Sequence, residues 1–284
     1  MRVLAHAKVN LTLEVLGRRS DGYHELRGVF ARASAPSDEV RIARNRVWRV
    51  RIRPPLDVPP GGELGTRAAR ALLEQVGQPG AMAIDIRKRI PVGSGLGGGS
   101  SDAAAVLRAL GRLLRIEDAL LHAVAAVIGS DVPFLLDGAI AEVRGRGEEV
   151  RPLPGGPWPG VLVLPRCRIA TVDAFARLDR AAWSDGSRTA QLASALARGG
   201  VTAAELRGVC ANAFDAVAVA RCPAIAEARE VAGVPLFLSG SGPALFGVCD
   251  DRTRALALLR RLRRHGWRAL AIDIGVPAAP VVRR

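Results

Sequence analysis

The sequence predicts an α+β protein with two domains. Its 284 residues suffice for one large domain or two modest ones, and 49% of them are hydrophobic, as in ordinary globular proteins. Each half of the chain mixes strand-like alternation with helix-like spacing of apolar residues. Four prolines and three glycines crowd into residues 152–160, which is typical of a domain boundary. We therefore expect an N-terminal domain at residues 1–153 and a C-terminal domain at residues 160–284.

The first half is expected to begin and end with strands. Its helices follow from alanine and leucine at helical spacing, and Ser100, Ser101 and Asp102 are expected to cap one of them. Its strands follow from alternating apolar residues, and the last pair turns around Gly145 and Gly147. The predicted strands are residues 3–16, 26–33, short pieces within 38–53, 81–90 and a pair within 139–150; the predicted helices are 66–76, 100–114 and 118–128.

The second half is also expected to mix strands and helices. A strand at residues 161–164 precedes three or four helices. A glycine turn at residues 240–243 then separates two short strands. The remaining predicted elements are strands at residues 235–239, 244–248 and 269–274 and a helix at residues 252–265.

The net charge of +14 raises the possibility of a nucleic-acid-binding protein. The arginines are spread along the chain, however, and only 4% of the residues are aromatic, too few to form stacking platforms for bases. We therefore expect no nucleic-acid partner. A basic surface also attracts small polyanionic substrates.

No targeting or membrane segment is expected. His6, Lys8 and Asn10 interrupt the first apolar stretch, and the longest uncharged run contains several glycines and prolines. We expect a cytoplasmic protein without a membrane partner, either a monomer or a weak homodimer. The four cysteines lack the paired spacing of metal or redox motifs and are expected to be reduced and buried; they are Cys167, Cys210, Cys222 and Cys249.

A glycine-rich loop between a predicted strand and a predicted helix indicates a phosphate site. Its backbone N–H groups can converge on an anion, and the helix N-terminus adds positive charge. No Gly-Lys-Ser/Thr follows, so the loop is not a Walker A motif. It contains a dinucleotide-type Gly-x-Gly-x-x-Gly pattern, but no acidic strand end follows the helix, which makes a nicotinamide or flavin site less favoured. The loop comprises Pro91, Val92, Gly93, Ser94, Gly95, Leu96, Gly97, Gly98, Gly99, Ser100 and Ser101.

Three motifs in order resemble the galactokinase, homoserine kinase, mevalonate kinase and phosphomevalonate kinase (GHMP) superfamily. The first begins at Ala5 and contains Lys8, the second is the glycine loop, and the third is residues 239–246. Two further segments, residues 17–26 and 129–138, resemble the branch that phosphorylates a cytidine diphosphate-linked methylerythritol in non-mevalonate isoprenoid synthesis. This resemblance implies a ribosomal-protein-S5-domain-2-like first domain with a left-handed βαβ unit, which binds the nucleotide, and a ferredoxin-like second domain, which binds the substrate.

The resemblance also implies roles for single residues. Asp131 would be the general base with Lys8 as its partner, and the glycine loop would hold ATP. Ser100 or Ser101 would contact phosphate or Mg²⁺, without a dedicated protein metal site. The substrate-binding residues implied are Asn10, Tyr23, His24, Phe175, Gly240 and Gly242, with the two aromatic rings stacking on cytosine and His24 binding its edge.

Some residues depart from the superfamily pattern, and two other functions stay open. His6 stands where proline is usual, which is expected to alter the local turn. The same fold could act on another alcohol, of the homoserine or mevalonate type. A basic protein that binds nucleic acid without turning over ATP is the alternative from a different class.

Overall fold

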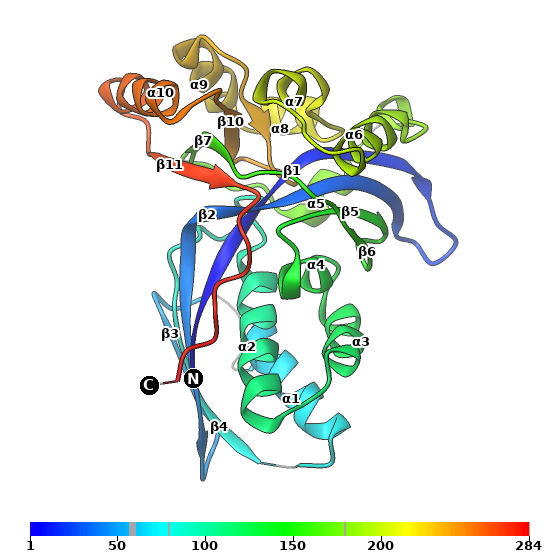
Figure 1. The fold of residues 1–284 in the computed structure, drawn as a ribbon, viewed down its shortest axis with the longest axis vertical. Coiled ribbons are helices and arrows are strands. Elements are labelled where there is room, and N and C mark those ends of the chain that lie inside the picture. Colours follow the sequence, from blue (N-terminus) through cyan, green and yellow to red (C-terminus); the bar gives the residue numbers. More distant parts are fainter. Residues whose placement is uncertain (57–60, 79, 179, 284) are drawn as a thin grey trace.

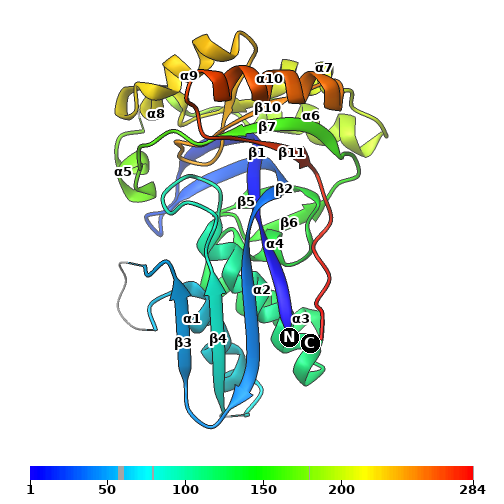
Figure 2. The same ribbon diagram turned by 90° about the vertical axis from the view of Figure 1, so that its left-hand side faces the viewer.

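The computed structural model describes residues 1–56, 61–78, 80–178 and 180–283. The chain forms two layered halves, one above the other in Figure 1. In the lower half, strands lie side by side with helices on one face of them, and in the upper half a row of helices covers a second sheet (Figure 2). The two chain termini lie next to each other in the lower half.

One long hairpin organises the first half. It consists of β1 (Arg2–Arg18) and β2 (His24–Asn45), which pair along most of their length. The C-terminal part of β2 also pairs with β4 (Ala81–Arg87), and its N-terminal part pairs with β5 (Ile140–Gly145). The hairpin therefore extends from the lower half into the upper one, as Figure 1 shows.

Helices cover one face of the lower part of this sheet (Figure 2). β3 (Arg49–Arg53) is a parallel neighbour of β4, and α1 (Leu64–Gln75) connects the two, which gives the expected βαβ unit. The alternate apolar residues of β4 are buried, as predicted. The other elements of this half are α2 (Gly98–Leu114), α3 (Asp118–Ile128), α4 (Val132–Asp137) and β6 (Glu149–Pro152).

The second half is ferredoxin-like, as the resemblance implied. Its elements are β7 (Trp158–Val163), α5 (Thr171–Ala176), a 3-10 turn (Arg180–Ala182), α6 (Ser187–Ala197), α7 (Ala203–Val209), β8 (Ala211–Asn212), α8 (Asp215–Arg221), α9 (Ala224–Ala232), β9 (Phe237–Leu238), β10 (Leu245–Val248), α10 (Arg252–Arg264) and β11 (Ala269–Ile274). Four antiparallel strands lie in the order β11-β7-β10-β9. Helices connect β7 to β9 and β10 to β11, so the strand order and connections are those of the ferredoxin-like fold. The predicted α+β fold class is confirmed.

The two halves are joined at several places. β11 meets β2 where Ile274 pairs with Ala33, and the short β8 lies parallel to β1. Beyond β11 the chain returns to the first half, where Arg2 and Val282 exchange two backbone hydrogen bonds. The exact division of the chain into two domains stays a prediction, because β1 and β2 belong to the core of both halves.

Several elements differ from the sequence-based expectation. The strands expected separately at residues 26–33 and from residue 38 onward are one strand, β2. The cap expected at Ser100 to Asp102 is wrong, because α2 begins at Gly98 with Gly97 as its N-cap. Helix α4 was not predicted, since six residues are too few to show a helical period. His6 lies in β1, and the β1–β2 register shifts between it and Lys8.

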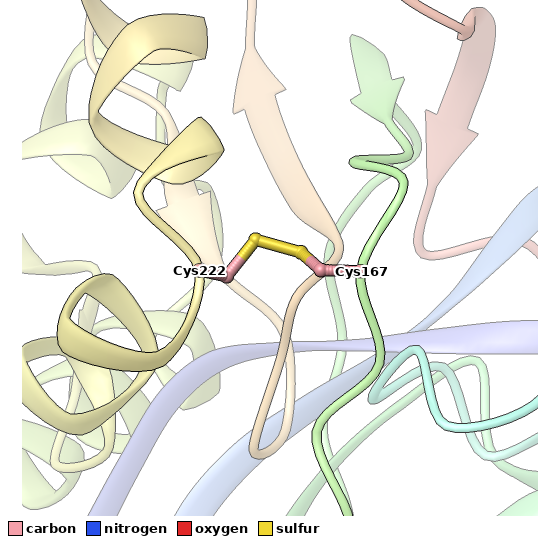
Figure 3. Close-up of a disulfide and its surroundings, with 2 residues drawn as sticks. All are labelled: Cys167 and Cys222. Carbon is pink, nitrogen blue, oxygen red and sulfur yellow. A yellow bond between two sulfur atoms is a disulfide. The ribbon is translucent and has the colours of Figure 1, made fainter.

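The expectation of four reduced cysteines is wrong for one pair. Cys167, in the segment between β7 and α5, is bonded to Cys222 at the end of α8 (Figure 3). Cys210 and Cys249 are free and buried, as expected. Across the described parts of the chain, the helices are too short or too polar for any of them to cross a membrane.

Candidate active site

The glycine loop leads from β4 into the N-terminus of α2. Gly93, Gly95 and Gly97 have φ values of 66°, 78° and 70°, a backbone conformation that glycine adopts without steric cost. The first N–H groups of α2 have no partner within the helix, and a helix N-terminus carries about half a positive charge. This end of α2 is therefore suited to bind phosphate.

A second loop packs against the glycine loop, backbone to backbone. A Cβ added at Gly95 would lie 2.0 Å from the Ser239 carbonyl oxygen, and one at Gly240 would lie 2.7 Å from the Gly95 carbonyl oxygen. The Ser239 hydroxyl donates to the Gly95 carbonyl at 3.0 Å. Because no side chain fits between them, both loops need glycine at these positions, and the second and third motifs form one wall.

Lys8 and Asp131 meet beside this wall. Lys8 Nζ lies 3.7 Å from Asp131 Oδ2. Gly97 is next to both, since a Cβ there would lie 3.1 Å from Lys8 Cγ and 3.5 Å from Asp131 Oδ2. The Lys8 backbone N–H donates to the Leu96 carbonyl at 3.0 Å, which fixes β1 to the glycine loop. The structure thus brings an ammonium, a carboxylate and the start of α2 to one place.

The surroundings of the two charges differ. Lys8 is buried, and burial lowers its pKa below the ordinary value while Asp131 opposes that change. The Asp131 side chain is 28% exposed. Asp131 occupies the N-cap position of α4, yet its carboxylate makes no capping hydrogen bond. The carboxylate is therefore free to accept a proton from a ligand.

Asn10 connects Lys8 to the third motif. Its Oδ1 accepts hydrogen bonds from Lys8 Nζ at 2.7 Å and from the Gly240 backbone N–H at 2.6 Å. The Asn10 side chain is buried. One carbonyl oxygen therefore holds both the ammonium and the turn of the third motif.

A cavity of about 1110 Å³ opens beside these groups. Its wall includes Lys8, Asn10, Asp131, Gly240 and the glycine loop from Pro91 to Ser100. The hairpin of β1 and β2 leads from Lys8 to further lining side chains, which are largely aromatic or apolar: Tyr23, His24, Leu26, Phe175, Trp183 and Phe214. The cavity therefore joins a phosphate-binding loop to a surface suited to a flat ring.

The aromatic side chains of this surface contact one another. The rings of His24 and Phe175 have centroids 4.9 Å apart, and Phe175 also meets Phe214 edge to face at 4.7 Å. Phe175 thus belongs both to the cavity wall and to the core. Burial and the nearby Arg18 lower the pKa of His24, so its ring is neutral at neutral pH and offers one donor and one acceptor.

Two of the predicted site residues lie outside the cavity lining. The Ser101 hydroxyl donates to the His6 carbonyl at 2.6 Å and is buried. Gly242 closes the third-motif turn, where its N–H donates to the Ser239 carbonyl at 2.9 Å. All the other predicted site residues line the cavity. Of Ser100 and Ser101, only Ser100 lines the cavity.

Two residues with a clear place in the site were not predicted. The Arg146 guanidinium lies 5.0 Å above the Tyr23 ring and lines the cavity. Asn212 donates to the carbonyls of Leu238 and Gly240 at 3.0 and 2.8 Å, which holds the third motif in place. Asparagine is rare in this chain, which was a usable signal for Asn212, whereas one arginine among 41 basic residues carries none.

A glycine loop at a helix N-terminus, an ammonium–carboxylate pair beside it and this two-domain fold define a GHMP-type small-molecule kinase. The GHMP kinases N terminal domain matches residues 63–139, and the GHMP kinases C terminal domain matches residues 190–266. A solved homoserine kinase from Cytophaga hutchinsonii has the same fold, with a TM-score of 0.76 at 18% identity over 98% of this chain and 95% of its own.

Full-length relatives identify the branch. The 4-diphosphocytidyl-2-C-methyl-D-erythritol kinase of Symbiobacterium thermophilum is 39% identical over 94% of this chain and 98% of its own length. That of Thermus thermophilus is 39% identical over 97% of both. A crystal structure of 4-(cytidine 5'-diphospho)-2C-methyl-D-erythritol kinase superposes with a TM-score of 0.79 at 36% identity, covering 97% of this chain and all of that one. The chain belongs to the 4-diphosphocytidyl-2-C-methyl-D-erythritol kinase family and is a small-molecule kinase that uses ATP.

Proposed function

We propose that this kinase transfers the γ-phosphoryl group of ATP to the 2-hydroxyl of 4-diphosphocytidyl-2-C-methyl-D-erythritol, in the non-mevalonate route to isoprenoid precursors. One observation carries the proposal: the Lys8–Asp131 pair adjoins Gly97 at the start of α2, in a cavity that also contains Tyr23 and Phe175. The first three residues suit phosphoryl transfer to an alcohol, and the two rings suit a nucleobase.

The chemistry follows from the position of each group. The Asp131 carboxylate accepts the proton of the 2-hydroxyl as its oxygen attacks the γ-phosphorus and the bond from that phosphorus to the β-bridging oxygen breaks, which releases ADP. The Lys8 ammonium stabilises negative charge on the attacking oxygen. The N–H groups of the glycine loop and the start of α2 bind the polyphosphate. Phosphoryl transfer needs positioning and charge neutralisation above all, and the cavity wall supplies both.

The other end of the cavity accounts for the cytidine diphosphate. Tyr23 and Phe175 would stack on cytosine, and neutral His24 would bind its edge with a donor and an acceptor. Arg146 would bind the diphosphate, together with the third motif at Gly240, which lines the same cavity. Homoserine and mevalonate have no ring, so this surface favours the cytidine-linked alcohol over them.

Magnesium is expected to enter with the nucleotide. Within the described residues, no group of three or more His, Cys, Asp or Glu side chains could hold a metal by itself. The cavity wall offers the Asp131 carboxylate and several hydroxyl groups, among them that of Ser100. This set suits Mg²⁺, which commonly binds few protein oxygens and several phosphate oxygens. When bound, the ion would neutralise charge on the β- and γ-phosphates, with Ser100 as its protein contact.

Further assignments accompany this proposal. Residues 1–153 would provide the nucleotide site, and residues 160–284 would complete the substrate site through Phe175 and Gly240. A cytoplasmic location and a monomer or weak homodimer stay predictions from the sequence. The nucleic-acid alternative would require salt-dependent binding to DNA or RNA without ATP turnover.

The proposal is tested with Asp131→Asn and a panel of alcohols. We expect wild-type protein to release ADP with the cytidine-linked substrate and not with homoserine or mevalonate. Asp131→Asn should lower kcat by about 10² to 10⁴, the usual contribution of a general base. The KM for ATP and the KM for the alcohol should change little. Asp118→Asn is the control, because Asp118 is an exposed carboxylate at the start of α3 that does not line the cavity.

Two results would contradict the proposal. Turnover of homoserine or mevalonate in preference to the cytidine-linked alcohol would contradict the substrate assignment, although the fold assignment would stand. A kcat of Asp131→Asn equal to that of the wild type would remove the base assignment.

A further inference from the structure

Helix α4, which follows Asp131 directly, is held against β1 and β2 at three points. At its N-terminus, Asp131 meets Lys8 of β1. In its middle, Phe134 packs edge to face on Phe30 of β2, with ring centroids 5.7 Å apart. At its C-terminus, Arg32 of β2 donates from Nε to the Gly138 carbonyl at 2.9 Å and from Nη2 to the Leu135 carbonyl at 3.1 Å.

The burial of Arg32 is unusual and has a local cause. Arg32 is 1% exposed, and among the described residues it has no ion pair with a carboxylate. Burial and the neighbouring Arg108 lower its pKa to about 10, while the charge of Asp137 opposes this change, so Arg32 stays protonated at neutral pH. A buried charge is costly unless it is paired. Here the last carbonyls of α4, which carry the negative end of the helix dipole, take the place of a carboxylate.

Arg32 and Lys8 act on the same short helix from the same surface. They are cross-strand neighbours in β1 and β2, so they lie side by side on the sheet. A helix of six residues is about 9 Å long. It has little internal freedom, and a shift of its C-terminal end therefore moves its N-cap. The distance between the Asp131 carboxylate and the Lys8 ammonium depends on the Arg32 contacts.

We propose that Arg32 is a positioning residue that sets the place of the Asp131 carboxylate by fixing the C-terminal end of α4. The inference rests on the proposed function, in which Asp131 is the general base. Arg32 does not line the cavity, so its side chain would not contact a ligand there, and its hydrogen bonds to α4 are its route to Asp131. Misplacement of a reacting group by about 1 Å can lower a rate by about 10². Loss of the Arg32 contacts therefore reduces turnover without weakening the binding of ATP or of the alcohol.

The test is a cycle of four proteins: wild type, Arg32→Met, Asp131→Asn and the double variant. Arg32→Met keeps much of the volume and removes both donors. We expect kcat to fall about 10- to 100-fold in Arg32→Met, with both KM values within about twofold of wild type. In the Asp131→Asn background the same substitution should change the residual kcat by less than about twofold, because the group that Arg32 positions is already absent.

Two further variants separate positioning from general stability. Arg32→Lys keeps the charge and can donate to at least one of the two carbonyls, so it should recover part of the lost kcat. Arg108→Met is the matched control: Arg108 is a neighbouring, largely buried arginine that donates to the Ala279 carbonyl at 2.6 Å instead of to α4. It should lower Tm and leave kcat within about twofold. If Arg32→Met does not fold, the cycle is run with Arg32→Lys.

The outcomes distinguish the two ideas. Full turnover in Asp131→Asn would end the base assignment and the Arg32 proposal with it. A strongly impaired Asp131→Asn combined with an equal kcat loss from the Arg32 substitution in both backgrounds would overturn only the positioning role. An unchanged kcat in Arg32→Met would do the same.

Discussion

At the scale of single residues, the site depends on polar side chains that each serve two partners. Asn10 is the clearest example, because one oxygen accepts from both the Lys8 ammonium and the Gly240 N–H. A hydrogen bond to the ammonium stabilises the charged form of Lys8, while burial opposes it. Asn10 therefore influences the protonation state of Lys8 as well as its position.

The opposing effects of burial and the Asn10 hydrogen bond on Lys8 predict the pH at which activity declines on the alkaline side. In the proposed mechanism Lys8 acts as the ammonium, so turnover should fall as pH rises through its pKa, which burial lowers below the ordinary lysine value. Asn10→Leu removes a hydrogen bond to the charged form and should move this decline to lower pH. The measurement is kcat/KM from pH 6 to 10 for wild type and variant.

A second asparagine provides the control for that experiment. Asn212→Leu loses two bonds to the third motif but none to Lys8, so it should change KM and leave the position of the alkaline decline unchanged. Identical pH profiles for wild type and Asn10→Leu would contradict the role given to Asn10.

At the scale of elements, one buried ion cluster holds both ends of the glycine loop. Lys88, just beyond β4, donates to Asp38 of β2 and to Asp102 of α2. Asp38 also accepts from the backbone N–H groups of Arg89 and Ile90, immediately before the loop. The three charged side chains are nearly inaccessible to solvent. The loop is therefore fixed to β2, β4 and α2 at once.

The cluster predicts a pH dependence of stability. Burial, together with the neighbouring Asp38, raises the pKa of Asp102 to about 8, and the Lys88 ammonium opposes both effects. In the unfolded chain an aspartate has a pKa of about 3.9. Between these values the folded state binds a proton that the unfolded state lacks. The stability due to this group is therefore full below about pH 4 and is lost as pH rises toward 8, by at most about 1.4 kcal/mol per pH unit.

Asp102→Asn tests whether the stability of the folded protein falls with rising pH because of this carboxyl group. The amide resembles the protonated acid and does not titrate, so the free energy of unfolding should fall less with pH in the variant than in the wild type. Urea denaturation at pH 5, 6, 7 and 8 measures both. Parallel curves for the two proteins would show that Asp102 is already ionised at pH 5.

At the scale of the whole molecule, the sequence predicted the regular elements better than the irregular ones. Long periodic segments such as α3 and β11 were predicted within a residue or two. β2 was divided in the prediction, since Pro36 interrupts its pattern, although tertiary pairing on both sides keeps it one strand. Helix α4 gave no periodic signal, yet it positions Asp131.

The sequence predicted many residues of the site but not the contacts between them. The phosphate loop followed from glycine content and local order alone. Lys8 and Asp131 were paired through resemblance, because spacing along a chain says nothing about contact between distant residues. Arg32 and Arg146 were missed for the same reason, and so was the pairing of Cys167 with Cys222, which are 55 residues apart.

That disulfide leads to a prediction for the whole second half. It fixes the segment before α5 to the end of α8, and this segment also contacts the active site, where Ile169 N–H donates to the Gly93 carbonyl and Thr171 meets Ser241. A cross-link that closes a loop of this size stabilises a protein by about 2–4 kcal/mol. The double variant Cys167→Ala with Cys222→Ala should lose about that much. It should also raise KM for the cytidine-linked substrate, because α5 carries Phe175.

A variant of a free cysteine provides the control, and a count of free thiols tests whether the cross-link forms. Cys249→Ala removes a free buried thiol, so it should change stability only through packing, and dithiothreitol should still lower its Tm as it lowers that of the wild type. Reductant should have no effect on the double variant. Two free thiols in denatured, unreduced wild-type protein are expected. Four would mean that the cross-link does not form, and the wild type and the double variant should then respond alike to reductant.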